Sequence, residues 1–233
     1  MSSIQQNIEQ ITSQIDASLQ KCGRPRDSVQ LLAVSKTKPV ADIFAAAQVG
    51  QRAFGENYVQ EGADKVDYFR QNHPELELEW HFIGPIQSNK TRIVAENFAW
   101  VHTVDRAKIA QRLNDQRPEG LAPLQVLIQV NTSGEASKSG ASGEEIFALA
   151  ELISTLPNLT LRGLMSIPAS TPDYAAQLGA FTKLAELQRS LAQRLPDVTL
   201  DTLSMGMSGD MDAAIEAGST MVRIGSAIFG ARS

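Results

Sequence analysis

Eight short runs of apolar and β-branched residues alternate with amphipathic stretches along this chain from Val29 onward. Alternation of this kind is typical of a parallel sheet whose strands are joined by crossover helices. No linker or change in composition interrupts the series, which favours one closed (β/α)8 barrel over an open doubly wound sheet. The expected strands cover residues 30–35, 52–54, 78–82, 100–103, 124–130, 160–165, 199–204 and 221–224.

An extra helix is expected before the first strand. Apolar residues recur there at helical spacing, at Ile4, Ile8, Ile11, Ile15 and Leu19. We therefore expect one domain over residues 1–233, with an N-terminal helix in 1–22 and the barrel in 29–230. Within the barrel, the longest helix is expected over 172–194, Asp105 is expected to cap one helix, and Ser142 with Glu145 forms a predicted capping box.

Composition excludes several classes of function. The chain carries 21 basic and 26 acidic side chains, a net charge of -5, and no run of Lys or Arg that would neutralise a nucleic-acid backbone. Its single cysteine, Cys22, leaves neither an intramolecular disulfide nor a zinc-ligand pattern. No stretch resembles a signal peptide or the ~20 apolar residues of a membrane span. We expect a cytoplasmic protein without a metal, a nucleic-acid partner or a membrane partner.

Lys36 is the first candidate functional residue, because it follows the apolar run 31–35 at the C-terminal end of the first expected strand. Functional groups of such barrels gather at these strand ends. A lysine in a partly dry pocket has a lowered pKa and can attack an aldehyde. From position alone, a charge that ends the strand in solvent is the commoner case. Lys38 is expected to be a solvated or auxiliary charge.

Two small-residue loops follow the last two expected strands, at 204–210 and 225–230. Glycines let backbone N–H groups approach an anion, and hydroxyl groups and helix N-termini add donors. In such barrels a phosphate site is commonly built from the loops after strands seven and eight. Either loop alone fits a plain tight turn equally well, whereas the pair predicts a phosphate site.

Arg223 lies inside the last expected strand, where a buried guanidinium needs a partner. From the sequence, the partner of Arg223 is either a carboxylate or the ring nitrogen of a ligand. Asn57, Tyr58 and Ser166 follow other strands and could contact a ligand, whereas His81, between two aromatic residues, is expected to be a hydrogen-bonded core histidine.

Segments 31–36, 54–57, 80–84, 204–208 and 223–230 together resemble the pyridoxal phosphate homeostasis protein family, of the YggS and PROSC type. The resemblance covers essentially the whole chain and implies an alanine racemase-like barrel that binds pyridoxal 5'-phosphate (PLP). It implies that Lys36 forms a Schiff base with PLP and that Arg223 faces the pyridine nitrogen. Ser208, Gly225 and Ser226 would hold the phosphate, and further lining residues would be Asn57, Met205, Gly206 and Met207.

The resemblance also implies a role in the supply and buffering of this vitamin B6 cofactor, with delivery to apo-enzymes and no catalytic residue. Related racemases draw an acid/base tyrosine from a second domain, and this chain ends soon after Gly230. We therefore expect a protein that is not an enzyme. We also expect a monomer. A racemase-like amino-acid enzyme is the alternative, with Lys38, Lys138 or Tyr58 as its extra base. A Schiff-base aldolase for phosphorylated sugars ranks third, because Arg223 has no evident role in sugar cleavage.

Overall fold

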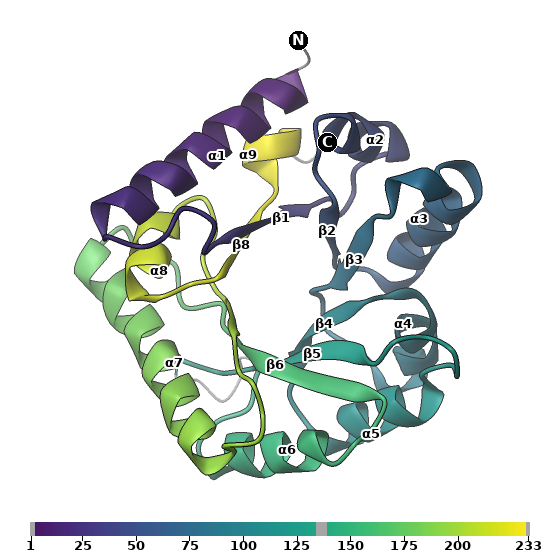
Figure 1. Cartoon of the computed structure of the whole chain (residues 1–233), viewed down its shortest axis with the longest axis vertical. Helices are drawn as coiled ribbons and strands as arrows, with labels where there is room; N and C mark the ends of the chain where they lie inside the picture. Colours follow the sequence, from purple (N-terminus) through teal and green to yellow (C-terminus); the bar gives the residue numbers. More distant parts are fainter. Residues whose placement is uncertain (1–2, 134–138, 232–233) are drawn as a thin grey trace.

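The computed structural model describes residues 3–133 and 139–231. Within these residues, the parallel strands close into a barrel in chain order, from β1 to β8, with helices around the outside (Figure 1). The strands are β1 Gln30–Val34, β2 Ala53–Glu56, β3 Glu79–Phe82, β4 Trp100–Val104, β5 Leu124–Gln129, β6 Leu159–Met165, β7 Thr202–Ser204 and β8 Met221–Ile224. The predicted (β/α)8 barrel is confirmed.

Pairing between the first and last strands closes the barrel. Leu31 lies opposite Val222 and Ala33 lies opposite Ile224 in this parallel ladder. The ends of the strands differ slightly from the expected ranges, since β2 extends to Glu56 and β7 begins only at Thr202. Both differences lie where the apolar pattern is weak.

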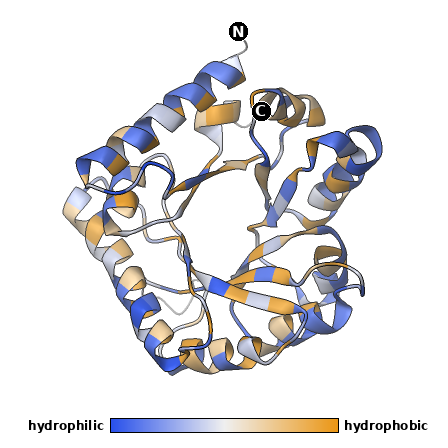
Figure 2. Cartoon of the chain, viewed as in Figure 1, coloured by the Kyte–Doolittle hydropathy of each residue, from blue (hydrophilic) through white to orange (hydrophobic). Residues whose placement is uncertain are grey.

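The outer layer consists of helices that surround the strands and carry both hydrophobic and hydrophilic residues (Figure 2). Their bounds are α1 Ser3–Lys21, α2 Val40–Gln48, α3 Val59–Asn72, α4 Thr91–Asn97, α5 Ala107–Gln116, α6 Glu144–Ser154, α7 Tyr174–Arg194, α8 Met211–Ala217 and α9 Ser226–Phe229, with 3-10 turns at Pro74–Leu76 and Ser88–Lys90. The predicted N-terminal helix is α1, which lies against α8 and α9. It buries Ile8, Ile11, Ile15 and Leu19, each worth about 1.5–3 kcal/mol of hydrophobic stabilisation.

Two predicted helix caps are wrong. Helix α6 is preceded by Gly143 at the N-cap position and has no side-chain cap, so Ser142 and Glu145 form no capping box. Arg106, not Asp105, occupies the N-cap position of helix α5, and it makes no side-chain capping hydrogen bond. The long helix α7 does have a side-chain cap, because the Asp173 carboxylate accepts from Ala176 N–H.

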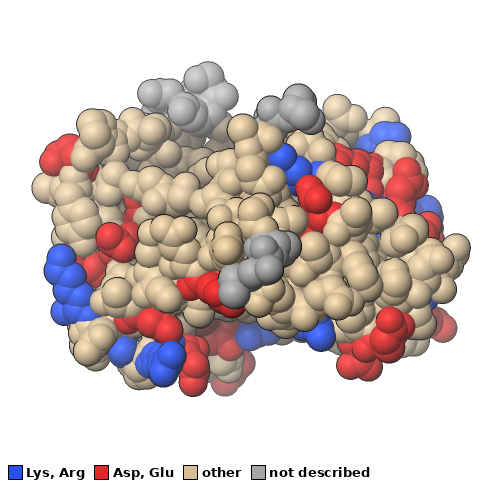
Figure 3. Space-filling model, turned by 90° about the horizontal axis from the view of Figure 1, so that it is seen from above, with Lys and Arg blue, Asp and Glu red and all other residues tan. Residues whose placement is uncertain are grey.

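The described part of the chain holds no helix that could cross a membrane. On the face seen in Figure 3, basic and acidic side chains are interspersed between larger areas of other residues. Within residues 3–133 and 139–231, no group of three or more His, Cys, Asp or Glu side chains is placed to hold a metal ion.

Candidate functional site

Residues at or just after the C-terminal ends of β1, β2, β3, β6, β7 and β8 line a cavity of about 370 Å³, which we call the rim cavity. Small-molecule sites typically measure roughly 300–1,000 Å³. Its walls bring together residues that are far apart in the sequence because parallel strands end at the same edge of the barrel. Seven of the nine predicted site residues line it, namely Lys36, Asn57, Met207, Ser208, Arg223, Gly225 and Ser226.

The other two predicted residues, Met205 and Gly206, do not line the rim cavity. Met205 is fully buried. Gly206 has a φ of +106°, and a Cβ there would lie 2.7 Å from the Cβ of Ala214. The structure therefore gives Gly206 a conformational role in the turn after β7.

The candidate bases for an amino-acid enzyme lie in different surroundings. Lys38 lines the rim cavity, and its Nζ donates a 2.8 Å hydrogen bond to the carbonyl of Ala231. Tyr58 is 48% exposed and is not part of the cavity wall. Lys138 lies outside the described residues.

Arg223 is almost completely buried and contacts no carboxylate among the described residues. Its Nη1 donates to Ser204 Oγ at 2.6 Å, and its Nη2 donates to the carbonyl of Ser166 at 2.9 Å. Burial lowers the pKa of Arg223 to about 10, against an opposing effect of Asp210. The side chain is therefore still a cation at neutral pH.

A chain of hydrogen bonds continues from Arg223 across the barrel interior. Ser204 Oγ lies 2.9 Å from His102 Nδ1, and His102 Nε2 lies 2.9 Å from His81 Nδ1. His81 Nε2 lies 2.7 Å from a carboxylate oxygen of Glu79, whose side chain is 42% exposed. Since arginine can only donate, the chain is satisfied when every member donates toward Glu79. This arrangement gives both histidines a proton on Nε2.

His81 and His102, the two histidines of this hydrogen-bond chain, are neutral at physiological pH. Burial lowers the pKa of His102 well below its ordinary value, and electrostatic interactions with His81 and with the Arg223 cation lower it further. Burial also lowers the pKa of His81, although its hydrogen bond with Glu79 opposes the shift. The prediction that His81 is a hydrogen-bonded core histidine is confirmed. The contact of His81 with His102 was not predicted, and neither was the contact of His102 with Ser204, which depends on barrel closure.

Two buried polar atoms have no hydrogen-bond partner among the described residues, Asn57 Oδ1 and Ser166 Oγ. Asn57 lines the rim cavity, and Ser166 precedes Ile167, another residue of its wall. A buried polar atom without a partner costs about 1–3 kcal/mol. Unpaired groups at a cavity wall are suited to a polar ligand.

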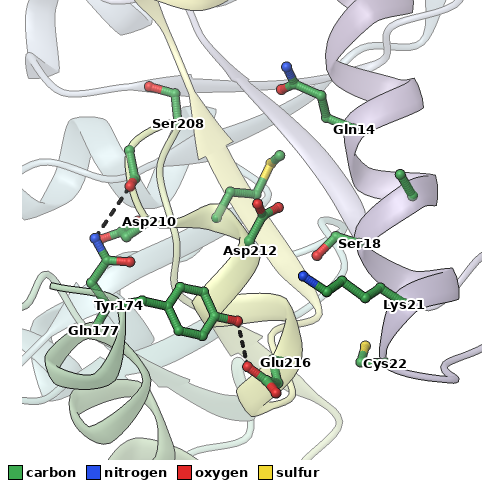
Figure 4. A pocket seen from close by; sticks show the side chains of 13 residues that line it. Gln14, Ser18, Lys21, Cys22, Tyr174, Gln177, Ser208, Asp210, Asp212 and Glu216 are labelled. Carbon is green, nitrogen blue, oxygen red and sulfur yellow. Dashed lines mark hydrogen bonds between the residues drawn. The ribbon is translucent and has the colours of Figure 1, made fainter. Parts of the chain in front are cut away.

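A larger cavity of about 710 Å³ lies between α1, α7 and α8 (Figure 4). Of the predicted site residues, only Ser208 lines it. Asp210, Asp212 and Glu216 give this cavity an acidic lining, and Tyr174 donates a hydrogen bond to Glu216. It lacks a lysine at a strand end, so we place the candidate site in the rim cavity.

Comparisons with known proteins agree with this architecture. The model of the family described as "Alanine racemase, N-terminal domain" matches residues 3–233. A pyridoxal phosphate homeostasis protein from Vibrio cholerae is 73% identical over 232 residues, covering 100% of this chain and 98% of the relative. One from Escherichia coli is 55% identical, with coverage of 100% and 98%. The chain belongs to the pyridoxal phosphate homeostasis protein family.

A similar protein has been solved with PLP bound. PipY of Synechococcus elongatus, solved with PLP bound, superposes with a TM-score of 0.80 at 35% identity and covers 93% of this chain and 100% of that chain. The family assignment from segments of the sequence is thereby confirmed, together with the alanine racemase-like barrel. The individual roles of the rim-cavity residues remain predictions.

Proposed function

We propose that this protein binds pyridoxal 5'-phosphate through Lys36 and takes part in its intracellular homeostasis, as the names of its relatives indicate. The observation that carries the proposal is the convergence of Lys36, Arg223 and Ser226 on one cavity of suitable size. The PLP-bound PipY structure supports the same choice of cofactor.

The rim cavity fits the chemical parts of this cofactor. When bound, pyridoxal 5'-phosphate supplies an aldehyde that a lysine amine can attack with loss of water. Lys36 would provide that amine. Ser208, Gly225 and Ser226 would hold the phosphate through hydroxyl and backbone N–H groups, and Asn57 would place its unpartnered oxygen among the ligand-facing groups. Met205 and Gly206 would support this wall from behind.

Arg223 would donate a hydrogen bond to the pyridine nitrogen. A guanidinium has no acceptor, so it can only keep that nitrogen unprotonated. An unprotonated ring withdraws electrons less strongly, which favours holding the cofactor over using it as an electron sink.

The proposed carrier is a cytoplasmic monomer with one domain over 1–233 that passes the cofactor to apo-enzymes without turning over a substrate. The racemase-like alternative draws its support from Lys38, which lines the same cavity. The bond of Lys38 to Ala231 O favours a structural role instead.

The decisive experiment compares absorption spectra before and after borohydride reduction, followed by peptide mass mapping. The expected result is a visible band that reduction abolishes and a pyridoxyl mass on Lys36. Lys36→Ala should lose both and remain folded, whereas Lys38→Ala, the matched control, should retain both. A wild-type protein that stays colourless and unmodified with added pyridoxal 5'-phosphate would contradict the proposal.

Carrier and enzyme are separated by two further measurements on the loaded protein. A carrier activates an added apo-enzyme and leaves amino acids unchanged. An amino-acid enzyme exchanges the α-proton of its substrate for deuterium in D₂O. Exchange that Lys38→Ala abolishes would establish the racemase-like alternative.

A further inference from the structure

A buried ion cluster lies under the segment that carries Lys36. Lys65 projects from α3 with only 7% of its side chain exposed, and its Nζ is 3.0 Å from Oε1 of the fully buried Glu56. Glu61, one helical turn earlier, lies 2.9 Å from the same ammonium group. None of these three side chains is among the predicted site residues.

The cluster contacts the main chain on both sides of Lys36. Lys65 Nζ donates a 2.8 Å hydrogen bond to the carbonyl of Ser35, and the Ser35 hydroxyl donates to Glu56. On the other side, the N–H of Thr37 donates a 2.7 Å hydrogen bond to Glu61 Oε1. The backbone of Lys36 is therefore tied at the preceding and the following residue.

Thr37 adopts a conformation that needs such support. Its φ is +65°, in the left-handed region, although it is a β-branched residue. This conformation is a genuine outlier for such residues, and it persists only where surrounding contacts impose it. The Thr37 side chain is exposed to solvent, so packing of that side chain does not supply the constraint. The hydrogen bond from the Thr37 N–H to Glu61 supplies this constraint on the main chain.

We propose that Lys65, Glu56 and Glu61 are positioning residues, which hold the turn after β1 so that the Lys36 amine points into the rim cavity. We name these three residues the Lys65 clamp. The inference rests on the proposed function, since it assigns the orientation of the lysine that receives the cofactor aldehyde.

A purely stabilising ion pair explains the cluster less well. Burying charges costs desolvation energy that their attraction often only balances, so a buried ion pair is weak evidence for stability. A pair between Lys65 and Glu56 alone would already satisfy the buried charge. The additional bonds to Ser35 O and from Thr37 N–H connect the cluster to the one segment that carries Lys36.

Glu61→Ala is the most informative variant. Its side chain is 31% exposed, so the substitution leaves Lys65 paired with the fully buried Glu56 and the fold intact. Asp64→Ala is the matched control, because it removes the same charge from an exposed position of the same helix. Glu61→Gln retains an oxygen acceptor for Thr37 N–H and should rescue most of the effect.

Binding of two ligands distinguishes an effect on the orientation of Lys36 from an effect on the rest of the site. Pyridoxal 5'-phosphate requires the Lys36 amine, whereas pyridoxine 5'-phosphate lacks the aldehyde and reports only the cavity and its phosphate contacts. For Glu61→Ala we expect the dissociation constant for pyridoxal 5'-phosphate to rise about tenfold, from the strain released at Thr37. Affinity for pyridoxine 5'-phosphate should match that of Asp64→Ala. Equal losses for both ligands, or no loss for either, would overturn the proposal.

Amide hydrogen exchange of the ligand-free protein tests the clamp without the cofactor. The Thr37 amide should exchange faster in Glu61→Ala than in the wild type, and Asp64→Ala should not change it. An unaltered Thr37 amide would overturn the clamp even if the protein binds the cofactor. If the wild type forms no adduct at Lys36 but the Thr37 amide still exchanges faster in Glu61→Ala, the result would contradict the proposed function and leave the clamp standing.

Discussion

Arg223 Nη1 lies 2.6 Å from the hydroxyl oxygen of Ser204, and this contact connects the rim cavity with the histidine chain below it. The hydroxyl accepts from the guanidinium and donates toward His102. One serine therefore fixes both the direction of Arg223 and the tautomer of His102. Neither role depends on a carboxylate next to the arginine.

Ser204→Ala should weaken pyridoxal 5'-phosphate binding several-fold and destabilise the protein by about 1–3 kcal/mol, because buried donors lose their partner. Titration of the cofactor and urea unfolding of the ligand-free protein measure the two effects. Ser219→Ala is the matched control, since Ser219 is equally buried but its hydroxyl donates to backbone carbonyls such as Met205 O. Ser219→Ala should lose stability and keep its affinity. Unchanged affinity in Ser204→Ala would show that Arg223 needs no support from Ser204.

Arg223→Met should loosen cofactor binding by about tenfold or more and change the free energy of unfolding of the ligand-free protein by much less. Methionine replaces the volume, and the change removes a buried cation without stranding a buried carboxylate. The loss of affinity would reflect the loss of the proposed donor to the ring nitrogen. A large loss of stability in the ligand-free protein, equal to the loss in binding energy, would assign Arg223 to the fold instead.

Acid should destabilise the fold through His102. Its folded pKa is lowered by burial, so the unfolded chain binds the extra proton first as the pH falls below about 6.5. Its contribution to the free energy of unfolding is therefore complete above this pH and falls by at most about 1.4 kcal/mol per pH unit below it. His81 acts in the same direction, and Glu56, whose pKa burial raises, acts in the opposite one.

Comparison of variants isolates the effect of His102 because the other groups are common to both proteins. Urea unfolding between pH 7.5 and 5.5 should show a smaller loss of stability for His102→Gln than for the wild type. NMR of the His102 ring gives a second test in the unmodified protein. A ring that protonates at its ordinary pKa in the folded state would refute the prediction.

Local sequence patterns were enough to predict the barrel and most of its rim. Strand-like runs, small-residue loops and the position of Lys36 depend on neighbours along the chain, and each is close to its predicted place. The predicted position of Arg223 in the last strand also holds. What the sequence left open there was the partner of Arg223, which is a serine hydroxyl and a backbone carbonyl.

Interactions between distant segments could not be predicted in the same way. His102 meets Ser204 across 102 positions of the chain, and Lys65 reaches Ser35 across 30. Such contacts depend on strand register and on which face of α3 turns inward. Glu56 shows the limit well, since a carboxylate after an apolar run indicates a loop, yet it is fully buried because Lys65 pairs with it.

The loop after β7 offers a test that separates conformational glycines from permissive ones. At Gly206 the φ of +106° and the 2.7 Å approach to Ala214 Cβ exclude a side chain, whereas Gly209 has open space and no positive φ. Gly206→Ala should therefore cost about 2 kcal/mol or more of unfolding free energy, combining left-handed strain with overpacking. Gly209→Ala should change it by less than about 0.5 kcal/mol, as expected of a surface site. Thermal unfolding of both variants measures the contrast, and similar melting temperatures would mean that the turn after β7 relaxes to admit a side chain.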